Sequence, residues 1–343
     1  MRKRAVLLGI AALAAAAAFA ARLPAALRYR FALDQPFRYR IDYAGKGTTA
    51  RGADAAPLPV TVEFRSRAVV RGDRAAPPAG GSADSFDVQV RMEAFRHVLT
   101  VGPDTETVVL GPGVFTLARN GQTVADLADG KLRGTPAGGE YVKLGLPIVL
   151  SLGARGDLAR VQGMERFDAL FPQIALRDTL AANLVRLPAD PVGAGSAWEA
   201  TYPLALPSCP AGGCALKVRH AVVGAVRSLG FACVRIKVEG RADLARKDFT
   251  YPDGYDLVAG SETRYRTFAQ TVAGELDFAP EEGIVVRSDL HVQTRSEATY
   301  AYAESGLAPV EVFVRSELAV DSTFKVAAEK ERGLWERVKG AFE

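Results

Sequence analysis

The sequence predicts an α+β fold. It consists mainly of long antiparallel strands in two β-rich halves, shaped like a half-barrel or clam, with a helical segment between them. Three observations lead to this prediction. Residues 283–302 and 309–326 alternate between apolar and charged side chains over unusual lengths. Residues 161–186 instead carry apolar side chains at helical spacing. The Pro- and Gly-rich stretch Leu187–Trp198 lies between the two halves and is predicted to be a hinge.

The N-terminal half, residues 27–160, contains several stretches of period-two alternation. Phe37, Tyr39 and Ile41 fall on one face, with charged residues between them. This pattern is typical of a strand with one buried face. It recurs at residues 60–65 and 86–93, and residues 114–127 are predicted to form a hairpin around Asn120-Gly121. The Gly- and Pro-rich stretches between these strands are predicted to be loops: 45–59 and 71–83.

The C-terminal half, residues 187–326, holds the longest strands. Ile284, Val286 and Leu290 share one face, opposite Arg287 and Asp289. Residues 310–324 repeat the pattern, and residues 240–262 are predicted to be an irregular loop. One side of each strand is therefore predicted to face solvent and the other to be buried.

Two helical segments are predicted. In residues 161–186, Phe167, Leu170, Phe171 and Ile174 form an apolar stripe that should pack on the sheet. Residues 327–343 form a charged amphipathic C-terminal helix. This second helix is compatible with docking at the sheet edge and with lying on a membrane surface.

The first residues predict an export signal. Met1-Arg-Lys-Arg4 is followed by an apolar run from Ala5 to Ala21, and small residues surround a cleavage point near Ala20. Residues 1–20 are therefore a signal peptide or, alternatively, an uncleaved N-terminal membrane anchor. Either reading places the protein in the periplasm or cell envelope of a bacterium.

The three cysteines fit such an oxidising compartment. Cys209 and Cys214 flank a short Pro-Ala-Gly-Gly turn and are predicted to form a structural disulfide, with a redox or metal role as the alternative. Cys233 lies in a predicted strand and should be a small core residue.

Charge and motifs exclude several functions. The chain has 43 basic and 39 acidic residues, and three of the basic ones lie in the predicted signal. This near balance does not favour a nucleic-acid partner. The three histidines have no ligand or catalytic partner at motif spacing, and no hydrolase, phosphate-loop or zinc motif occurs. The sequence therefore predicts no catalytic residue, no metal, no cofactor and no enzymatic activity.

The apolar faces of the strands are the candidate binding surface. A long one-faced sheet covered by a helix tends to leave a cavity. The hydroxyls on that face are expected either to line the cavity or to bond to backbone or lie near strand ends: Ser288, Thr294, Ser296, Ser316 and Ser322. The candidate cavity-lining residues are Phe64, Val90, Met92, Phe171, Ile174, Leu290, Val292, Val314, Leu318 and Phe324.

Two resemblances accompany this interpretation. Leu27-Arg-Tyr-Arg-Phe31, Phe37-Arg-Tyr-Arg-Ile41 and the hinge pattern Leu-Pro-x-x-Pro-Val-x-x-Gly-x-x-Trp at 187–198 resemble uncharacterised exported bacterial proteins of the domain-of-unknown-function type. The expected architecture is also distantly similar to LolA-like lipoprotein carriers, which are half-barrels with a helical lid over an apolar cavity. The LolA-like resemblance is one of fold and transfers no residue roles.

The function expected from the sequence is an exported, non-enzymatic envelope protein. It would bind an apolar ligand, such as a lipid or a lipoprotein acyl chain, between sheet and helix. The alternative is a structural or protein-interaction component of the envelope without a ligand, and the third reading is a hydrolase with an unrecognised site.

Overall fold

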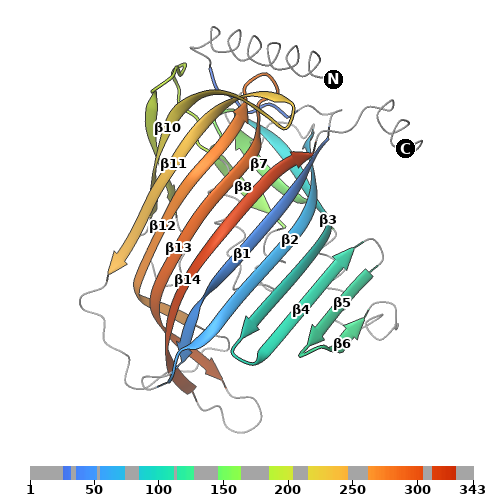
Figure 1. Cartoon of the computed structure of the whole chain (residues 1–343), viewed down its shortest axis with the longest axis vertical. Helices are drawn as coiled ribbons and strands as arrows, with labels where there is room; N and C mark the ends of the chain where they lie inside the picture. Colours follow the sequence, from blue (N-terminus) through green and yellow to red (C-terminus); the bar gives the residue numbers. More distant parts are fainter. Residues whose placement is uncertain are drawn as a thin grey trace, which may run out of the picture.

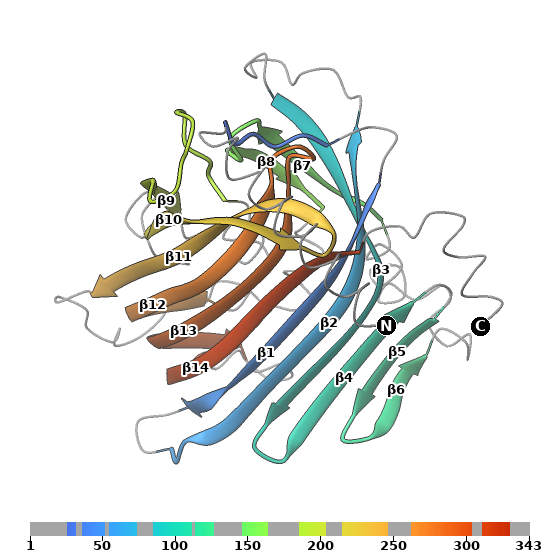
Figure 2. The ribbon, with the colours of Figure 1, turned by 45° about the horizontal axis from the view of Figure 1, so that its top comes forward.

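The computed structural model describes residues 26–31, 36–51, 55–73, 85–111, 114–126, 146–163, 185–203, 215–245, 262–303 and 311–329. Within these ranges the secondary structure is entirely β, and no helix there is long and apolar enough to cross a membrane. The long strands run side by side and curve as one sheet, with β7 and β8 behind its upper end (Figures 1 and 2).

One antiparallel sheet contains all fourteen strands. Twelve of them follow the order β6-β5-β4-β3-β2-β1-β14-β13-β12-β11-β10-β9, while β7 pairs with β3 and β8 with β7. The strands are β1 Phe37–Arg51, β2 Leu58–Asp73, β3 Ser85–Val101, β4 Asp104–Gly111, β5 Val114–Arg119, β6 Gln122–Asp126, β7 Ile148–Gly153, β8 Leu158–Gln162, β9 Ala197–Pro203, β10 Ala215–Ser228, β11 Phe231–Ala245, β12 Glu262–Ala279, β13 Ile284–Ala303 and β14 Glu311–Glu329.

The α+β prediction is wrong for the described chain, which is antiparallel β-sheet. Residues 158–162 belong to β8 and residues 185–187 have no regular secondary structure, so both ends of the predicted central helix at 161–186 lack helical structure. Residues 327–329 are the end of β14 rather than the start of a C-terminal helix. Residues 164–184 and 330–343 lie outside the described residues, as does the predicted export signal at 1–20.

The first and last described long strands join the two halves of the chain. β1 pairs with β14 along nearly its whole length, from Arg38 opposite Glu329 to Arg51 opposite Ser316. The other long strands pair mainly with sequence neighbours. The strands of both halves are therefore one continuous sheet rather than two sheets meeting at the 187–198 hinge.

Local turn chemistry explains the hairpin between β5 and β6. Asn120 and Gly121 have φ angles of 50° and 77°, which are the left-handed values that a type I′ turn requires. The predicted hairpin at 114–127 is thereby confirmed. The predicted loops at 45–59 and 71–83 begin too early, because β1 continues to Arg51 and β2 to Asp73.

Strand β3 has two different neighbours along one edge. Its first residues, Ser85 to Val90, pair with β7, whereas Phe95 to Val101 pair with β4. A bulge at Glu93 separates the two parts, because Ala68 faces Met92 while Arg67 faces Ala94. The sheet therefore forks at this bulge, and β4 to β6 diverge from β7 and β8 (Figure 1).

Hydrogen bonds close the upper end, where the turns at 229–230 and 280–283 lie. Tyr29 donates its amide to Ala154 and Arg30 to Gly283, while Leu187 donates to Arg155. On the other side, the Trp198 indole of β9 donates to the carbonyl of Arg186 at 2.7 Å. The β7–β8 turn is thus linked to β9 through residues 185–187, and the upper end is closed although β6 and β9 do not pair.

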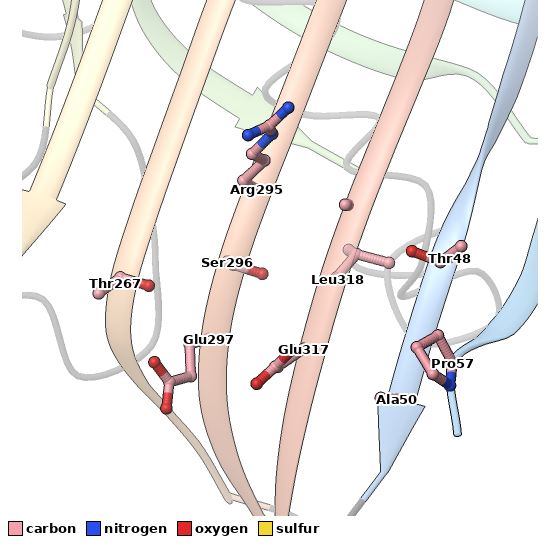
Figure 3. Close-up of a pocket in the computed structure, with 10 residues that line it drawn as sticks. Thr48, Ala50, Pro57, Thr267, Arg295, Ser296, Glu297, Glu317 and Leu318 are labelled. Carbon is pink, nitrogen blue, oxygen red and sulfur yellow. The ribbon is translucent and has the colours of Figure 1, made fainter. Parts of the chain in front are cut away.

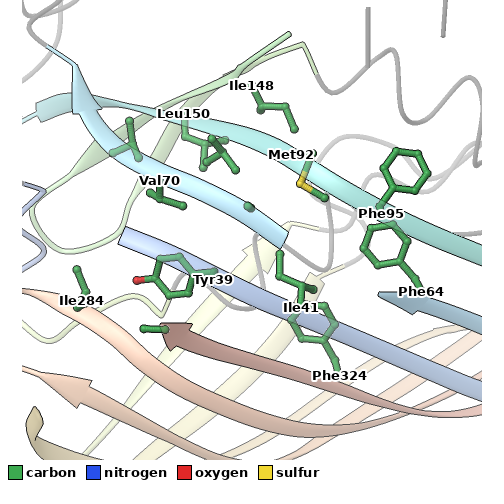
Figure 4. Close-up of a cluster of buried hydrophobic side chains, with 14 of the residues drawn as sticks. Tyr39, Ile41, Phe64, Val70, Met92, Phe95, Ile148, Leu150, Ile284 and Phe324 are labelled. Atoms are coloured by element: carbon green, nitrogen blue, oxygen red, sulfur yellow. The ribbon is translucent and has the colours of Figure 1, made fainter. Parts of the chain in front are cut away.

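Two clusters of buried apolar side chains fill this closed end. One brings Ile148 and Leu150 of β7 together with residues of β1, β2, β3, β11, β13 and β14 (Figure 4). The other centres on β10 to β12 and includes Leu27 and Tyr29 of the N-terminal segment. The tips of β11 to β13 are buried on both faces, since Cys233 belongs to the first cluster and its neighbour Val234 to the second.

Candidate ligand-binding face

The two faces of the sheet differ in chemistry. In β2, Val60, Val62 and Phe64 are buried, while Glu63 and Arg65, which alternate with them, are exposed. We call the face with Phe64 the inner face and the opposite one the outer face. One inner row crosses the sheet through consecutive cross-strand pairs: Trp198, His220, Val238, Gly274, Leu290, Phe324, Tyr43, Phe64, His97, Val108 and Leu117.

On β13 and β14, burial on the inner face decreases toward the lower end, where β1 leads into β2, although Phe268 of β12 and Val60 of β2 stay buried there. In β13, Leu290 is 2% exposed, whereas Val292, Thr294 and Ser296 are half-buried. In β14, Phe324 is 3% exposed, whereas Val320 and Leu318 are half-buried. The upper rows are therefore a filled core, and the lower rows of the central strands present a partly exposed surface.

We call this surface the lower inner face. Its members lie on β12, β13, β14 and β1: Gln270, Val292, Thr294, Ser296, Leu318, Val320, Gly47 and Thr49. Apolar and small polar side chains alternate across it, and none of these residues is charged. It can therefore contact an apolar molecule without desolvating an ion.

Hydroxyl and amide groups on this face are partly satisfied by one another. The Gln270 side-chain amide donates to the Thr294 hydroxyl at 3.2 Å. The buried Ser322 hydroxyl donates to the carbonyl of Val292 at 3.0 Å. The backbone-bonded reading of Ser322 is thus the correct one, while Thr294 and Ser296 lie on the half-buried surface.

Glycines allow the strands to approach closely. A Cβ placed on Gly47 would lie 1.9 Å from the carbonyl oxygen of Ala319 in β14, and one on Gly274 would lie 2.1 Å from that of Asp289 in β13. Any side chain would push these neighbouring strands apart, so glycine is required for the close approach and the curvature it permits. These two positions lie on the inner face of β1 and β12.

Two histidines lie in the filled inner row. His97 and His220 are 0% and 1% exposed, and burial lowers the pKa of each from 6.5 to about 4. The His220 ring stacks on Trp198 with ring centroids 5.0 Å apart. Both side chains are therefore neutral core residues at neutral pH, and they are far apart, on β3 and β10.

The structure separates the predicted cavity-lining residues into three groups. Phe64, Val90, Met92, Leu290 and Phe324 are buried in the filled core. Val292 and Leu318 are half-buried on the lower inner face. The remaining residues cannot be assigned: Phe171 and Ile174 lie outside the described residues, and for Val314 only its backbone position in β14 is described.

Of the three cysteines, the structure describes only Cys233. Cys233 is fully buried and has a free thiol, as predicted, and burial raises its pKa to about 12. Cys209 and Cys214 lie outside the described residues, so their disulfide stays a prediction.

A hollow of about 260 Å³ lies near the lower end of β13 and β14 (Figure 3). Arg295 and Glu297 of β13 line it, together with Glu317 of β14, which is directly opposite Glu297. Glu297 accepts a hydrogen bond from Arg266 at 3.2 Å. Arg295, Glu297 and Glu317 belong to the outer face, but Ser296 and Leu318 of the inner face also line the hollow, so its lining mixes charged and uncharged residues.

Sequence reasoning missed part of the lower inner face. The sequence predicts a loop at Gly47 and Thr49, because clusters of glycine and threonine usually mark one. Gln270 lies between long alternations and carried no signal of its own. Phe268 and Val272 are separated from Gln270 by Ala269 and Thr271, so period-two spacing places Phe268, Gln270 and Val272 on one face of a strand. This spacing was the only signal for Gln270.

Comparisons with known proteins provide little beyond this geometry. No protein-family model matches the chain, and no curated protein matches it. A solved structure described as lipid–protein interactions in lipovitellin is similar over 88% of this chain, with 9% identity and a TM-score of 0.45. This chain spans only 26% of the lipovitellin chain, and a likeness this distant carries no functional argument. Within the described ranges, no group of three or more His, Cys, Asp or Glu residues could hold a metal ion.

Proposed function

We propose that this protein is an exported, non-enzymatic envelope protein that binds an apolar ligand, such as a lipid or acyl chain, on its lower inner face. One observation carries the proposal. The same face of the same strands is a filled core at the upper end and a half-exposed, uncharged surface at the lower end. The ligand would extend the core downward along β13 and β14.

The chemistry of the face suits such a ligand. Val292, Val320 and Leu318 offer aliphatic contacts, and each methylene that a ligand buries there contributes about 0.8 kcal/mol. Thr294 and Ser296 offer hydroxyls that could bond to an ester or carboxyl group. The mixture fits a chain with a polar end better than a purely apolar molecule.

The first test is direct. Full-length protein from its native compartment should carry a lipid that native mass spectrometry detects and that organic extraction removes. The stripped protein should then bind a fluorescent fatty-acid probe. A parent protein with neither bound lipid nor probe affinity contradicts the proposal and favours a structural or interaction component of the envelope.

The second test locates the site. Leu318→Asn keeps the side-chain size but places an amide on the lower inner face, so probe affinity should fall about tenfold, while the melting temperature changes little because Leu318 is half-buried. Val223→Asn on β10 is the matched control, because Val223 is 56% exposed and lies away from this face. Equal probe affinity in the two variants would contradict the assignment.

A further inference from the structure

The outer face has an uneven distribution of charge. Three segments of β1 to β3 together contain seven arginines and only three carboxylates: residues 38–42, 63–71 and 89–98. The arginines are Arg38, Arg40, Arg65, Arg67, Arg71, Arg91 and Arg96, all of them exposed, and we call them the arginine patch. No lysine occurs within these bounds.

Cross-strand pairing places these charges directly against one another. Arg40 of β1 is opposite Arg67 of β2, and Arg65 of β2 is opposite Arg96 of β3. Like charges at directly opposite positions destabilise a sheet. Two such pairs side by side on neighbouring strands therefore oppose folding, and an external anion would relieve the repulsion.

The carboxylates nearby do not neutralise the patch. Arg40 is engaged by Asp42 at 3.1 Å, and Glu93 is shared between Arg38 and Arg91 at 3.7 and 4.0 Å. Arg67 and Arg96 make no ion pair with any residue that the structure describes. Each Arg–Arg pair thus contains one guanidinium that is free to bind an anion.

The outer face of β11 to β13 provides the contrast. Arg235 holds the Asp277 carboxylate with two hydrogen bonds, at 2.8 and 3.1 Å. Lys237 pairs with Glu239 at 2.7 Å, and Arg287 with Asp289 at 3.6 Å. Each of these three basic residues has a carboxylate partner among the described residues, which Arg67 and Arg96 lack.

We propose that the arginine patch docks the protein on an anionic lipid surface through the phosphate groups of the lipids. From Arg65 to Arg71 the patch extends about 20 Å along β2, and three strands make it about 10 Å wide. Such an area covers several phosphates rather than one free ion. A guanidinium binds phosphate through two parallel hydrogen bonds, which a lysine ammonium cannot do.

Features of the patch argue against nucleic acid. Its outward residues other than the charged ones are Val69, Gln89, Ala94 and Val98, so no aromatic side chain is available to stack on a base. Each strand is part of a wide sheet and cannot enter a duplex groove as a two-stranded ribbon could. A planar array of phosphates fits the patch better.

Vesicle flotation of the full-length chain tests the docking. The protein should bind vesicles made of equal parts phosphatidylcholine and phosphatidylglycerol, and bind phosphatidylcholine vesicles much less. Added salt should weaken the binding, because exposed charges are screened. Arg67→Glu with Arg96→Glu should lower the affinity for the anionic vesicles at least about tenfold.

Matched variants separate the patch from net charge. Arg219→Glu with Arg227→Glu makes the same charge change at exposed positions of β10 and should bind nearly as the parent does. Arg67→Gln with Arg96→Gln should also lose binding, without losing stability, because it removes the repulsion. All variants keep the same N-terminal residues, so any attachment there is common to them.

Three results would overturn the proposal. The parent could bind both vesicle types equally, the β1–β3 and β10 charge reversals could weaken binding equally, or a duplex oligonucleotide could bind more tightly than the anionic vesicles. The docking does not depend on the apolar ligand, so loss of vesicle binding and loss of fatty-acid binding are separate outcomes.

Discussion

The upper and lower parts of the inner face are formed by the same strands, with the same alternation, yet they are buried to different extents. At the upper end, β7 and the N-terminal segment pack against the face, and Phe64 and Leu290 are almost inaccessible. Two rows below, Thr294 and Val320 are half-buried. The comparison teaches that period-two alternation specifies which face points inward but not how completely it is covered.

The largest loss of stability should follow truncation of a side chain in the filled core of the inner face. Phe64→Ala removes a ring that is 1% exposed and contacts the Phe95 ring with centroids 5.8 Å apart. The cavity left behind should lower the free energy of unfolding by about 3–5 kcal/mol. Denaturant titration measures this loss, and a loss below about 1 kcal/mol would mean that the upper end is not filled.

The second-largest effect should come from acid, which destabilises the filled inner row that contains His97 and His220. The unfolded chain takes up a proton at each histidine below pH 6.5, whereas folded His97 and His220 do so only near their lowered pKa of about 4. The free energy of unfolding should therefore fall as the pH drops from 6.5 to 4, by about 3 kcal/mol for each histidine. Above pH 6.5 neither residue contributes to the pH dependence.

Variants separate the contribution of the buried histidines to acid-induced unfolding from the contribution of the carboxylates. His220→Phe should make the acid-induced loss of stability shallower in a series of denaturant titrations across this pH range. His291→Gln is the control, because the His291 side chain is 61% exposed on the outer face. Equal slopes for the parent and His220→Phe would mean that His220 is not excluded from water.

A pair of leucine truncations compares the two regions directly. Leu290→Ala should cost about 2–5 kcal/mol, because its neighbours in the filled core lose contacts. Leu318→Ala should cost at most about 1 kcal/mol, since the side chain is already half-exposed, and should instead weaken fatty-acid probe binding. Equal costs in thermal unfolding would contradict the distinction between the core and the lower inner face.

The smallest effect concerns the boundary between the regions. Ser322→Ala removes the hydroxyl that donates to the Val292 carbonyl and should lower stability by about 1 kcal/mol. Thr294→Val should change stability less, because Thr294 is half-exposed and water can replace its partner. A larger loss for Thr294→Val, measured by the same titration, would place the boundary lower on the sheet.

Sequence patterns predicted the strands better than their assembly. The alternation at 283–302 and 309–326 corresponds closely to β13 and β14, because one solvated face makes the period visible. The pairing of β1 with β14 could not be predicted, since register between such distant segments leaves no local signal. Gly47 was predicted to lie in a loop, whereas it lies in β1 and allows that strand to approach β14 closely.

The candidate site was predictable only in part for a related reason. Val292 and Leu318 were identified from their period-two positions, but the same criterion selected Phe64 and Leu290, which are core. What separates them is coverage by β7 and residues 26–31, which are remote in sequence from β13 and β14. Physical proximity of these elements is set by tertiary packing, which a local pattern does not contain.

The pairing of β1 with β14 also has a consequence in time. During synthesis at about 5–20 residues per second, on the order of tens of seconds pass between the emergence of Arg51 and that of its partner Ser316. Throughout that interval the long edge of β1 that β14 will cover has open amides and carbonyls, which can template pairing with another chain. We therefore expect newly made chains to require a holding chaperone, and folding to be slow because its decisive contact joins β1 to β14, the first and last strands that the structure describes.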